Sequence, residues 1–406
     1  MKYDLVIKNG YIYDENKIIK NDIAINDGII VKIGNNIDDY IDYIDASNCV
    51  ILPGFINTHI HFGEYYIKGY DGKLTTKEYI KYAENFNDFN LGNKELIRKT
   101  SSKICAYEAI KFGQTTLMGI RGWNSIEEYN IRLYMGYPLM KSNKLKEYLD
   151  NPYERFEAFK SDSLNNYYIF IHSLLTVNEY ILSKLSEYIK DKKVFIAIHL
   201  RETKDEEKEI KKKFKLSSLE VLEKYGLLSD KTLLVHCCYI NDNDIKIIKK
   251  YKCSISICPC SNLKLNNRIL NILKYNDINI CVGTDGVASN DSLNIMDDLK
   301  ILGLLYNISS YDLIKMITIN PNKYLNNKIG KICENYKADF NIYDLNNYKV
   351  VRKETFINNL IYSSDIIPKH VIVDGKYIVR DYKNIKYSEN DISNYNISDK
   401  INFDNK

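Results

Sequence analysis

Two histidines one residue apart, His59 and His61, end a short apolar segment that begins at Pro53. Alternate side chains of a β-strand share a face, so both imidazoles point the same way if this segment is a strand. Two neutral imidazoles on one face form half of a site for zinc or iron, and the remaining ligands must come from elsewhere in the chain. The alternative is a pair of ordinary strand histidines, which the rest of the chain can test.

Other polar residues stand at the ends of further short apolar segments. They are His172, His199 with Glu202 just beyond it, His236, and Asp285 between Thr284 and Gly286. Five of the six histidines of the chain therefore occupy this kind of position, and only His370 lies apart. Unrelated structural histidines would have no reason to recur there, so we interpret the set as one constellation.

The segments that carry these residues alternate with helical segments, as in a parallel α/β sheet or barrel. Eight strands are predicted: the strand of His59, then residues 115–120, 131–136, 167–174, 194–200, 232–238, 254–258 and 278–283. A helix over 94–111 should stop at Gly113, and Ser217 with Glu220 offers a capping box for another helix. Eight strand–helix units predict a (β/α)8 TIM-like barrel, whose active site lies where the strands end.

The two ends of the chain share a different pattern, in which short strands are separated by Asn-Gly and Asp-Gly turns. We predict that residues 1–54 and 331–387 form one small composite β-sandwich domain, beside a barrel domain of residues 55–330. Residues 388–406 are polar and are expected to form a tail at the surface.

Composition bears on several classes of function. The chain has 57 Lys and Arg against 53 Asp and Glu, with no concentrated basic face, so we expect no nucleic-acid partner. It has no apolar run near the roughly 20 residues that cross a membrane. Nine scattered cysteines and a start without a leader pattern favour the cytoplasm. A small-molecule substrate fits this balance, and a homo-oligomer is compatible with it.

Each polar residue can be given a chemical role. His59, His61, His199 and Asp285 suit one zinc or ferrous ion with a position left for water. Such an ion lowers the pKa of bound water from 15.7 toward about 7, which makes hydroxide available. Glu202 could then move the proton to the substrate if the chain turns after Leu200, or it could be a surface glutamate that opens the next helix. His236 could stabilise the oxyanion, or replace one of the four as a nitrogen ligand.

Five stretches together resemble the amidohydrolase superfamily, and within it the branch of methylthioadenosine and S-adenosylhomocysteine deaminases and triazine chlorohydrolases. They are residues 53–61, 199–203, 236–237, 261–265 and 283–290. The resemblance implies a (β/α)8 barrel with a composite β-sandwich and one catalytic metal. It implies metal ligation by His59, His61, His199 and Asp285, proton transfer by Glu202 and His236, and substrate contact by His172.

This resemblance predicts a metal-dependent hydrolase that acts on C–N bonds other than peptide bonds. The expected reaction is deamination of an amino-substituted nitrogen heterocycle, such as an adenosine-type nucleoside, an aminopurine or a pterin, with release of ammonia. The alternatives are a hydrolytic dechlorinase or cyclic-amide hydrolase of the same superfamily and a binding barrel without turnover. One divalent ion per chain is expected, zinc before iron.

Some residues depart from the pattern of similar proteins. The arginines of nucleoside-deaminating members near the end of the third strand are missing, since Arg132 lies earlier in that strand. Glu64 is a carboxylate where similar members often carry uncharged residues. It is expected to bind an amino or hydroxyl group of the ligand, or to pair with Lys68.

Three further features lie beside the predicted site. Arg121, at the end of the second strand, is a candidate for substrate binding. Trp123 could stack on a flat ring, although packing is the simpler interpretation. Residues 258–260, Cys-Pro-Cys, weakly suggest a second metal and more simply indicate apolar packing.

Overall fold

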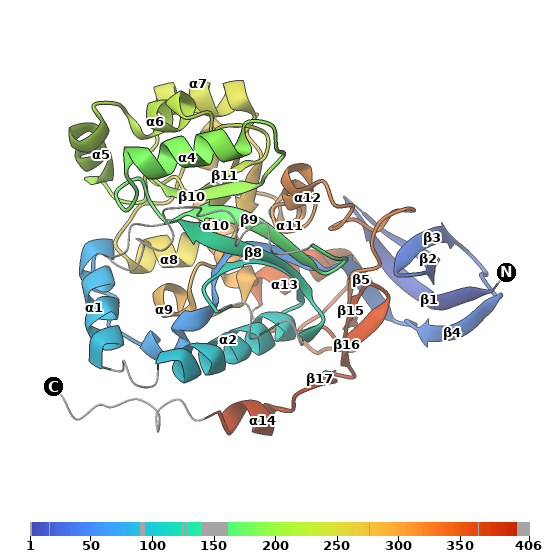
Figure 1. The fold of residues 1–406 in the computed structure, drawn as a ribbon. Coiled ribbons are helices and arrows are strands. Elements are labelled where there is room, and N and C mark those ends of the chain that lie inside the picture. Colours follow the sequence, from blue (N-terminus) through green and yellow to red (C-terminus); the bar gives the residue numbers. More distant parts are fainter. Residues whose placement is uncertain are drawn as a thin grey trace.

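The computed structural model describes residues 2–15, 17–89, 94–122, 126, 129–139, 161–275, 277–363 and 365–395. Two sheets dominate this part of the chain (Figure 1). One is built from eight parallel strands of the central segment, and the other from strands of both chain ends. None of the described helices is long and apolar enough to cross a membrane.

The eight parallel strands follow one another in chain order around the sheet. They are β6 (Phe55–His61), β7 (Gln114–Ile120), β8 (Arg132–Leu139), β9 (Asn165–Ile171), β10 (Ile196–Leu200), β11 (Thr232–His236), β12 (Ser254–Ile257) and β13 (Ile280–Val282). The last strand returns to the first, because the backbone N–H of Asp285 donates to the carbonyl of His59 at 2.9 Å. A Cβ at Gly283 would lie 2.7 Å from the His59 nitrogen, so only glycine permits this approach. The (β/α)8 barrel is confirmed.

Helices pack around the barrel and over the ends of its strands. They are η1 (Phe62–Ile67), α1 (Thr76–Phe89), α2 (Lys94–Lys111), α4 (Glu179–Ile189), α5 (Glu206–Phe214), α6 (Ser218–Lys224), α7 (Asp242–Tyr251), α8 (Pro259–Lys264), α9 (Val287–Asn290), α10 (Ile295–Tyr306), α11 (Ser310–Lys315) and α12 (Ile319–Leu325). The predicted capping box of Ser217 and Glu220 is present at the start of α6. The largest apolar cluster joins helices such as α4 and α10 to the strands that they cover.

The second sheet has nine strands in the order β17-β16-β15-β14-β5-β1-β2-β3, with β4 paired to β1. The strands are β1 (Tyr3–Asp14), β2 (Lys17–Asn26), β3 (Ile29–Gly34), β4 (Tyr40–Asp45), β5 (Cys49–Pro53), β14 (Phe340–Asp344), β15 (His370–Val373), β16 (Lys376–Arg380) and β17 (Lys383–Asn384). Both chain ends meet where β5 pairs antiparallel with β14, with Pro53 opposite Phe340. As expected, one β-structure contains strands from both ends.

Shorter elements complete the described chain: η5 (Ile272–Lys274), η6 (Lys353–Thr355), α13 (Phe356–Tyr362) and α14 (Glu389–Ser393). Figure 1 shows α14 lying beneath α2, and Lys111 of α2 contacts Glu389 of α14 at 2.8 Å. The predicted polar tail therefore begins against a barrel helix, and its residues 396–406 lie outside the described part of the chain.

A buried arginine joins the barrel to the second sheet. Arg132, at the start of β8, is 0% exposed, and its Nε and Nη2 donate to the two carboxylate oxygens of Asp339 at 3.1 and 3.0 Å. Nη2 also donates to Asp374 at 2.6 Å. Arg132 therefore ties β8 to the segments beside β14 and β15. It lies at the amino-terminal end of β8, away from the carboxyl ends of the strands.

Candidate metal centre and active site

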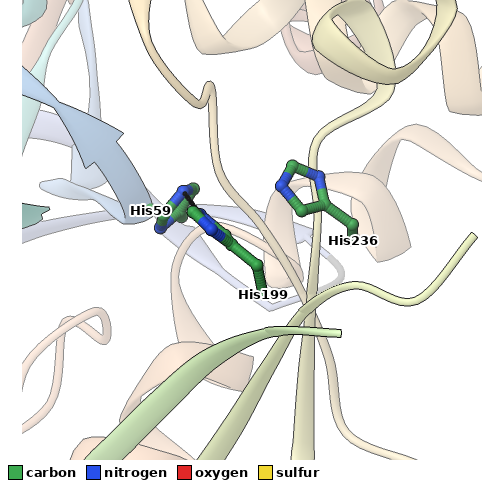
Figure 2. A group of neighbouring side chains, drawn as sticks. All are labelled: His59, His199 and His236. Carbon is green, nitrogen blue, oxygen red and sulfur yellow. Dashed lines mark hydrogen bonds between the residues drawn. The ribbon is translucent and has the colours of Figure 1, made fainter. Parts of the chain in front are cut away.

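Five histidines and three acidic residues, Glu64, Glu202 and Asp285, gather where the barrel strands end. Nε2 of His59 lies 3.1 Å from Nε2 of His61 and 3.0 Å from Nε2 of His199. Oδ1 of Asp285 lies 3.4 Å from the same His59 nitrogen and 3.3 Å from Nε2 of His61. Figure 2 shows His59 and His199 facing one another with His236 beside them. The four predicted metal ligands therefore meet at His59.

These distances fit a metal ion. In a tetrahedral site with bonds of about 2.0–2.1 Å, neighbouring ligand atoms lie about 3.3–3.4 Å apart, close to the separations seen around His59. Burial lowers the pKa of His59 to about 4 and that of His199 well below its usual value, so both rings offer lone pairs. Neutral nitrogens 3.0 Å apart repel unless a proton or a cation lies between them, so the donor set suits a bound cation.

The potential ligand atoms form two overlapping groups, each with all atoms within 4.8 Å of one another. One contains His59, His61 and Asp285, and the other contains His59, His199 and His236. His236 thus lies within reach of the centre, and its alternative role as a nitrogen ligand keeps geometric support. Within the described residues, neither group includes a cysteine, so Cys258 and Cys260 add no ligand to this centre.

The carboxylate of Asp285 is aimed by two serines. Ser261 and Ser289 donate to its Oδ2 at 2.6 and 3.0 Å, which leaves Oδ1 toward the histidines. The backbone of Asp285 is left-handed, with φ +59°, and this turn brings its side chain back over β6. Burial would raise the pKa of Asp285, but the facing histidines hold it well below its usual value, and the group stays ionised.

Glu64 lies directly behind His61. Nδ1 of His61 donates to Oε1 of Glu64 at 3.2 Å, and Nη1 of Arg121 donates to the same oxygen at 2.5 Å. The hydroxyl of Tyr79 donates to Oε2 at 3.3 Å. Burial alone would raise the pKa of Glu64, but His61 and Arg121 lower it to about 2. Lys68, the alternative partner expected from the spacing, instead donates from Nζ to the hydroxyl of Tyr65 at 3.4 Å.

The chain makes the expected turn after Leu200. Arg201 has φ +53° and is held by buried ion pairs, from Nη2 to Asp244 at 2.8 Å and from Nε to Glu207 at 3.0 Å. This turn directs Glu202 inward, where its side chain is only 15% exposed. Glu202 is therefore part of the cavity wall rather than a surface glutamate on the following helix.

Two side chains surround the Glu202 carboxylate. Oε1 accepts a hydrogen bond from the Thr76 hydroxyl at 3.2 Å, and Oε2 lies 3.8 Å from Nε2 of His236. Burial raises the pKa of Glu202, which favours a carboxyl group able to hold and release a proton. His236 is oriented by Nδ1, which donates to Oδ1 of Asn262 at 2.9 Å, so its Nε2 faces Glu202.

A cavity of about 490 Å³ opens above these groups. Its lining includes Glu202, His236 and Asp285 of the centre, together with His172, Arg121 and Arg98. His172 follows β9, and its buried Nδ1 has no hydrogen-bond partner among the described residues. Burial lowers the pKa of His172 to about 3, so a neutral ring faces the cavity. Trp123 lies outside the described residues.

Sequence reasoning missed several residues of this site. Thr76, Tyr79 and Arg98 reach it from the helices that follow β6, and no chemical motif marks them. Asn262 was within a stretch that carried the family resemblance, but its bond to His236 spans 26 residues. Only the three-dimensional fold brings such pairs together.

Comparisons with known proteins agree with this architecture. The sequence model of the protein family described as "Amidohydrolase family" matches residues 50–378 of this chain. A 5-methylthioadenosine/S-adenosylhomocysteine deaminase of Pyrococcus furiosus is 28% identical over 92% of this chain and 96% of its own. A deaminase of the same name from Clostridium tetani is 30% identical over 92% of this chain and 90% of its own. A 5'-deoxyadenosine deaminase of Methanococcus vannielii is 28% identical over 91% of this chain and 93% of its own.

Solved structures show the same fold. An adenosine deaminase from Xanthomonas campestris with bound zinc has a TM-score of 0.89 at 19% identity, over 98% of this chain and 99% of its own. An atrazine chlorohydrolase from Arthrobacter aurescens complexed with zinc has a TM-score of 0.90 at 18% identity, over 98% of this chain and 100% of its own. Because the family match over residues 50–378 spans most of the sequence, the chain belongs to the amidohydrolase family.

Proposed function

We propose that this protein is a metal-dependent hydrolase that removes the exocyclic amino group of a nitrogen heterocycle as ammonia. The observation that carries the proposal is the meeting of three imidazole Nε2 atoms and one carboxylate at His59, with Glu202 beside them at the floor of a cavity. Such a site combines a place for a cation with a buried group that can transfer protons.

His59, His61, His199 and Asp285 would hold one divalent ion, with zinc as the first candidate and iron as the second. When bound, the ion would lower the pKa of a water and provide a nucleophile near neutral pH. The orientation of the ligands is supported by the bonds from Ser261 and Ser289 to Asp285.

Glu202 would carry the protons of the reaction. As water adds to the ring carbon that bears the amine, Glu202 would accept a proton from the water and give it to the adjacent ring nitrogen, which makes the carbon electrophilic. A second transfer, of the proton left on the added hydroxyl, to the amine would let the amine leave as ammonia, and the carbon keeps the oxygen of the water as a carbonyl. The raised pKa of Glu202, caused by burial, supports both halves of this cycle.

His236 and His172 would act on the substrate directly. Nδ1 of His236 already donates to Asn262, so Nε2 would need a proton of its own to stabilise the charge on the oxygen that adds to the ring; Nε2 faces Glu202, the group that would supply that proton. His172 would orient the ring, because its buried Nδ1 has no hydrogen-bond partner among the described residues. Arg121 would contact a substituent from the wall of the cavity.

An adenosine-type nucleoside is the first candidate substrate, because deaminases of this class are similar to the chain over more than 90% of its length. Arg132 cannot take part in recognition, since it is fully buried in ion pairs with Asp339 and Asp374. The nucleoside would therefore be recognised by other groups, and an aminopurine or a pterin follows as a candidate.

Ammonia release tests the proposal. Metal-replete protein is incubated with adenosine derivatives, aminopurines, pterins and cytosine, with Glu202→Gln as the paired control. Release from at least one compound by the native protein and its loss in the variant is expected. Hydrolysis of a chlorinated or cyclic-amide compound without deamination of any amine would instead support the other hydrolases of the superfamily.

A further inference from the structure

Glu64 occupies an unusual place between the proposed metal centre and the substrate cavity. It lies in η1, three residues after His61, and is only 6% exposed. Its Oε1 accepts from both His61 and Arg121, and its Oε2 accepts from Tyr79. Both oxygens are thus engaged by side chains of the protein, which argues against a first role in binding the ligand.

The surrounding backbone leaves room for this carboxylate. A Cβ at Gly286, the residue after Asp285, would lie 2.8 Å from Oε2 of Glu64 and 3.2 Å from Cβ of His61. Glycine at this position therefore lets the segment after β13 pack directly against Glu64 and His61. The Glu64 carboxylate is therefore enclosed between His61 on one side and the segment that follows Asp285 on the other.

We propose that Glu64 is a positioning residue that couples the proposed metal ligand His61 to Arg121. Accepting a hydrogen bond from Nδ1 of His61 fixes the tautomer whose Nε2 lone pair faces Asp285 and the centre. The same oxygen holds the guanidinium of Arg121 at the cavity wall, although 34% of that side chain is exposed. One carboxylate thereby sets both metal affinity and the position of a substrate contact.

Arg121 is constrained from its backbone as well. It follows the last residue of β7 and has φ +60°, a left-handed conformation that directs the side chain across the rim toward η1. Without Glu64, the guanidinium would lose its buried partner and the ordering of a long side chain would rest on the backbone alone. The loss of Glu64 should therefore weaken substrate binding even where the metal is saturating.

This inference rests on the proposed metal site, and metal affinity tests it without any need for turnover. Zinc affinity is measured by competition with a chromophoric chelator. Glu64→Gln should lower it by about 10–100-fold, the usual effect of losing a carboxylate behind a metal-bound histidine. Glu84→Gln is the matched control, because Glu84 lines the same cavity from α1 and should leave zinc affinity unchanged.

Arg121→Gln separates the two halves of the proposal. It should leave zinc affinity equal or higher, because Glu64 then acts on His61 alone, and it should raise KM. If the proposed deamination is found, Glu64→Gln at saturating zinc should raise KM too, and adding Arg121→Gln to it should change KM little further. Unchanged zinc affinity in folded Glu64→Gln, or strictly additive effects on KM, would overturn the coupling.

Circular dichroism checks that each variant folds. If Glu64→Gln does not fold, Tyr79→Phe provides the second test, because it removes one of the three groups that hold Glu64 and keeps the ring. It should lower zinc affinity by a smaller factor than is expected for Glu64→Gln, and a native value would count against the proposal. Failure of every compound to release ammonia would contradict the proposed function while leaving these zinc affinities interpretable.

Discussion

Oε2 of Glu202 lies 3.8 Å from Nε2 of His236, and the two side chains come from the ends of neighbouring parallel strands, β10 and β11. Each is fixed from behind, Glu202 by the hydroxyl of Thr76 and His236 by the amide oxygen of Asn262. Both groups face the cavity above the histidine cluster. The carboxyl group of Glu202 and the imidazole of His236 therefore face the same part of the cavity from adjacent strands. Their roles can be separated by mutation.

Glu202→Gln should keep the metal and lose turnover. Glutamine retains the shape and can accept the Thr76 hydrogen bond, but it cannot transfer a proton. A general acid–base group contributes about 10²–10⁴ in rate, so kcat should fall by at least that range. Glu209→Gln, on the exposed face of α5, is the control. A drop of only severalfold would move the base to another residue, such as His236 or Asp285.

His236→Asn tests whether this imidazole binds the substrate oxygen or the metal. Under the proposed mechanism the variant keeps its full metal content, and kcat falls by about 10²–10³, as for the loss of one oxyanion donor. Elemental analysis and steady-state kinetics on the same preparation measure the two quantities. Loss of the metal would make His236 a ligand within the group that it forms with His59 and His199.

Asp285→Asn should lose metal and activity together. The amide keeps the size of the side chain but removes the negative charge that faces His59 and His61. Asp291→Asn is a matched control, since Asp291 lies six residues further on and pairs with Lys264. Metal content is measured by elemental analysis after dialysis against a chelator. Full metal content with native activity in Asp285→Asn would contradict the ligand assignment.

Much of this site could be predicted because its chemistry is tied to the periodicity of strands. His59 and His61 share a face of β6, and the carboxyl ends of parallel strands meet at one rim, so the sequence indicated which residues gather. The predicted ends of the strands were less accurate than the predicted set of site residues. The predicted strand 232–238 ends at His236, because His236 and Cys237 have φ +70° and +52° although the apolar pattern continues.

Contacts between distant residues could not be predicted in this way. The pair of Glu64 and Arg121 joins positions 57 residues apart, and local spacing suggested Lys68 as the partner instead. The structural role of Arg132 depends in the same way on Asp339 and Asp374, more than 200 residues away. Such pairs are decided by how the two sheets pack, which a linear pattern does not contain.

Arg132→Met should destabilise the fold. The change leaves the carboxylates of Asp339 and Asp374 without their buried partner, and breaking a buried ion pair on one side costs about 3–5 kcal/mol of unfolding free energy. Lys331→Met breaks the partly exposed pair with Glu15 and should cost less than about 1 kcal/mol. Urea unfolding followed by circular dichroism measures both. Equal losses in the two variants would contradict the role assigned to Arg132.

Glu206→Gln should change how stability depends on pH. Glu206 is buried at the start of α5, where its Oε2 accepts from the backbone N–H of Glu202 at 2.8 Å. Burial, followed by the charge of Glu202, raises the pKa of Glu206 from 4.5 to about 7. Between these values the folded protein holds a proton that the unfolded chain has released, so this group lowers stability as pH rises from about 4.5 to 7.

Glutamine at position 206 can accept the same backbone hydrogen bond and does not titrate, so this fall should be absent in the variant. Relative to the native protein, Glu206→Gln should therefore gain unfolding free energy as pH rises from 5 to 8, on the order of 3 kcal/mol for a shift of this size. Urea unfolding across this range measures the gain, and Glu209→Gln on the exposed face of the same helix should show none. Parallel pH profiles of the native protein and Glu206→Gln would mean that Glu206 is already ionised in the folded state at pH 5. The hydrogen bonds from the Glu202 and Thr203 backbone would then outweigh the cost of burying its charge.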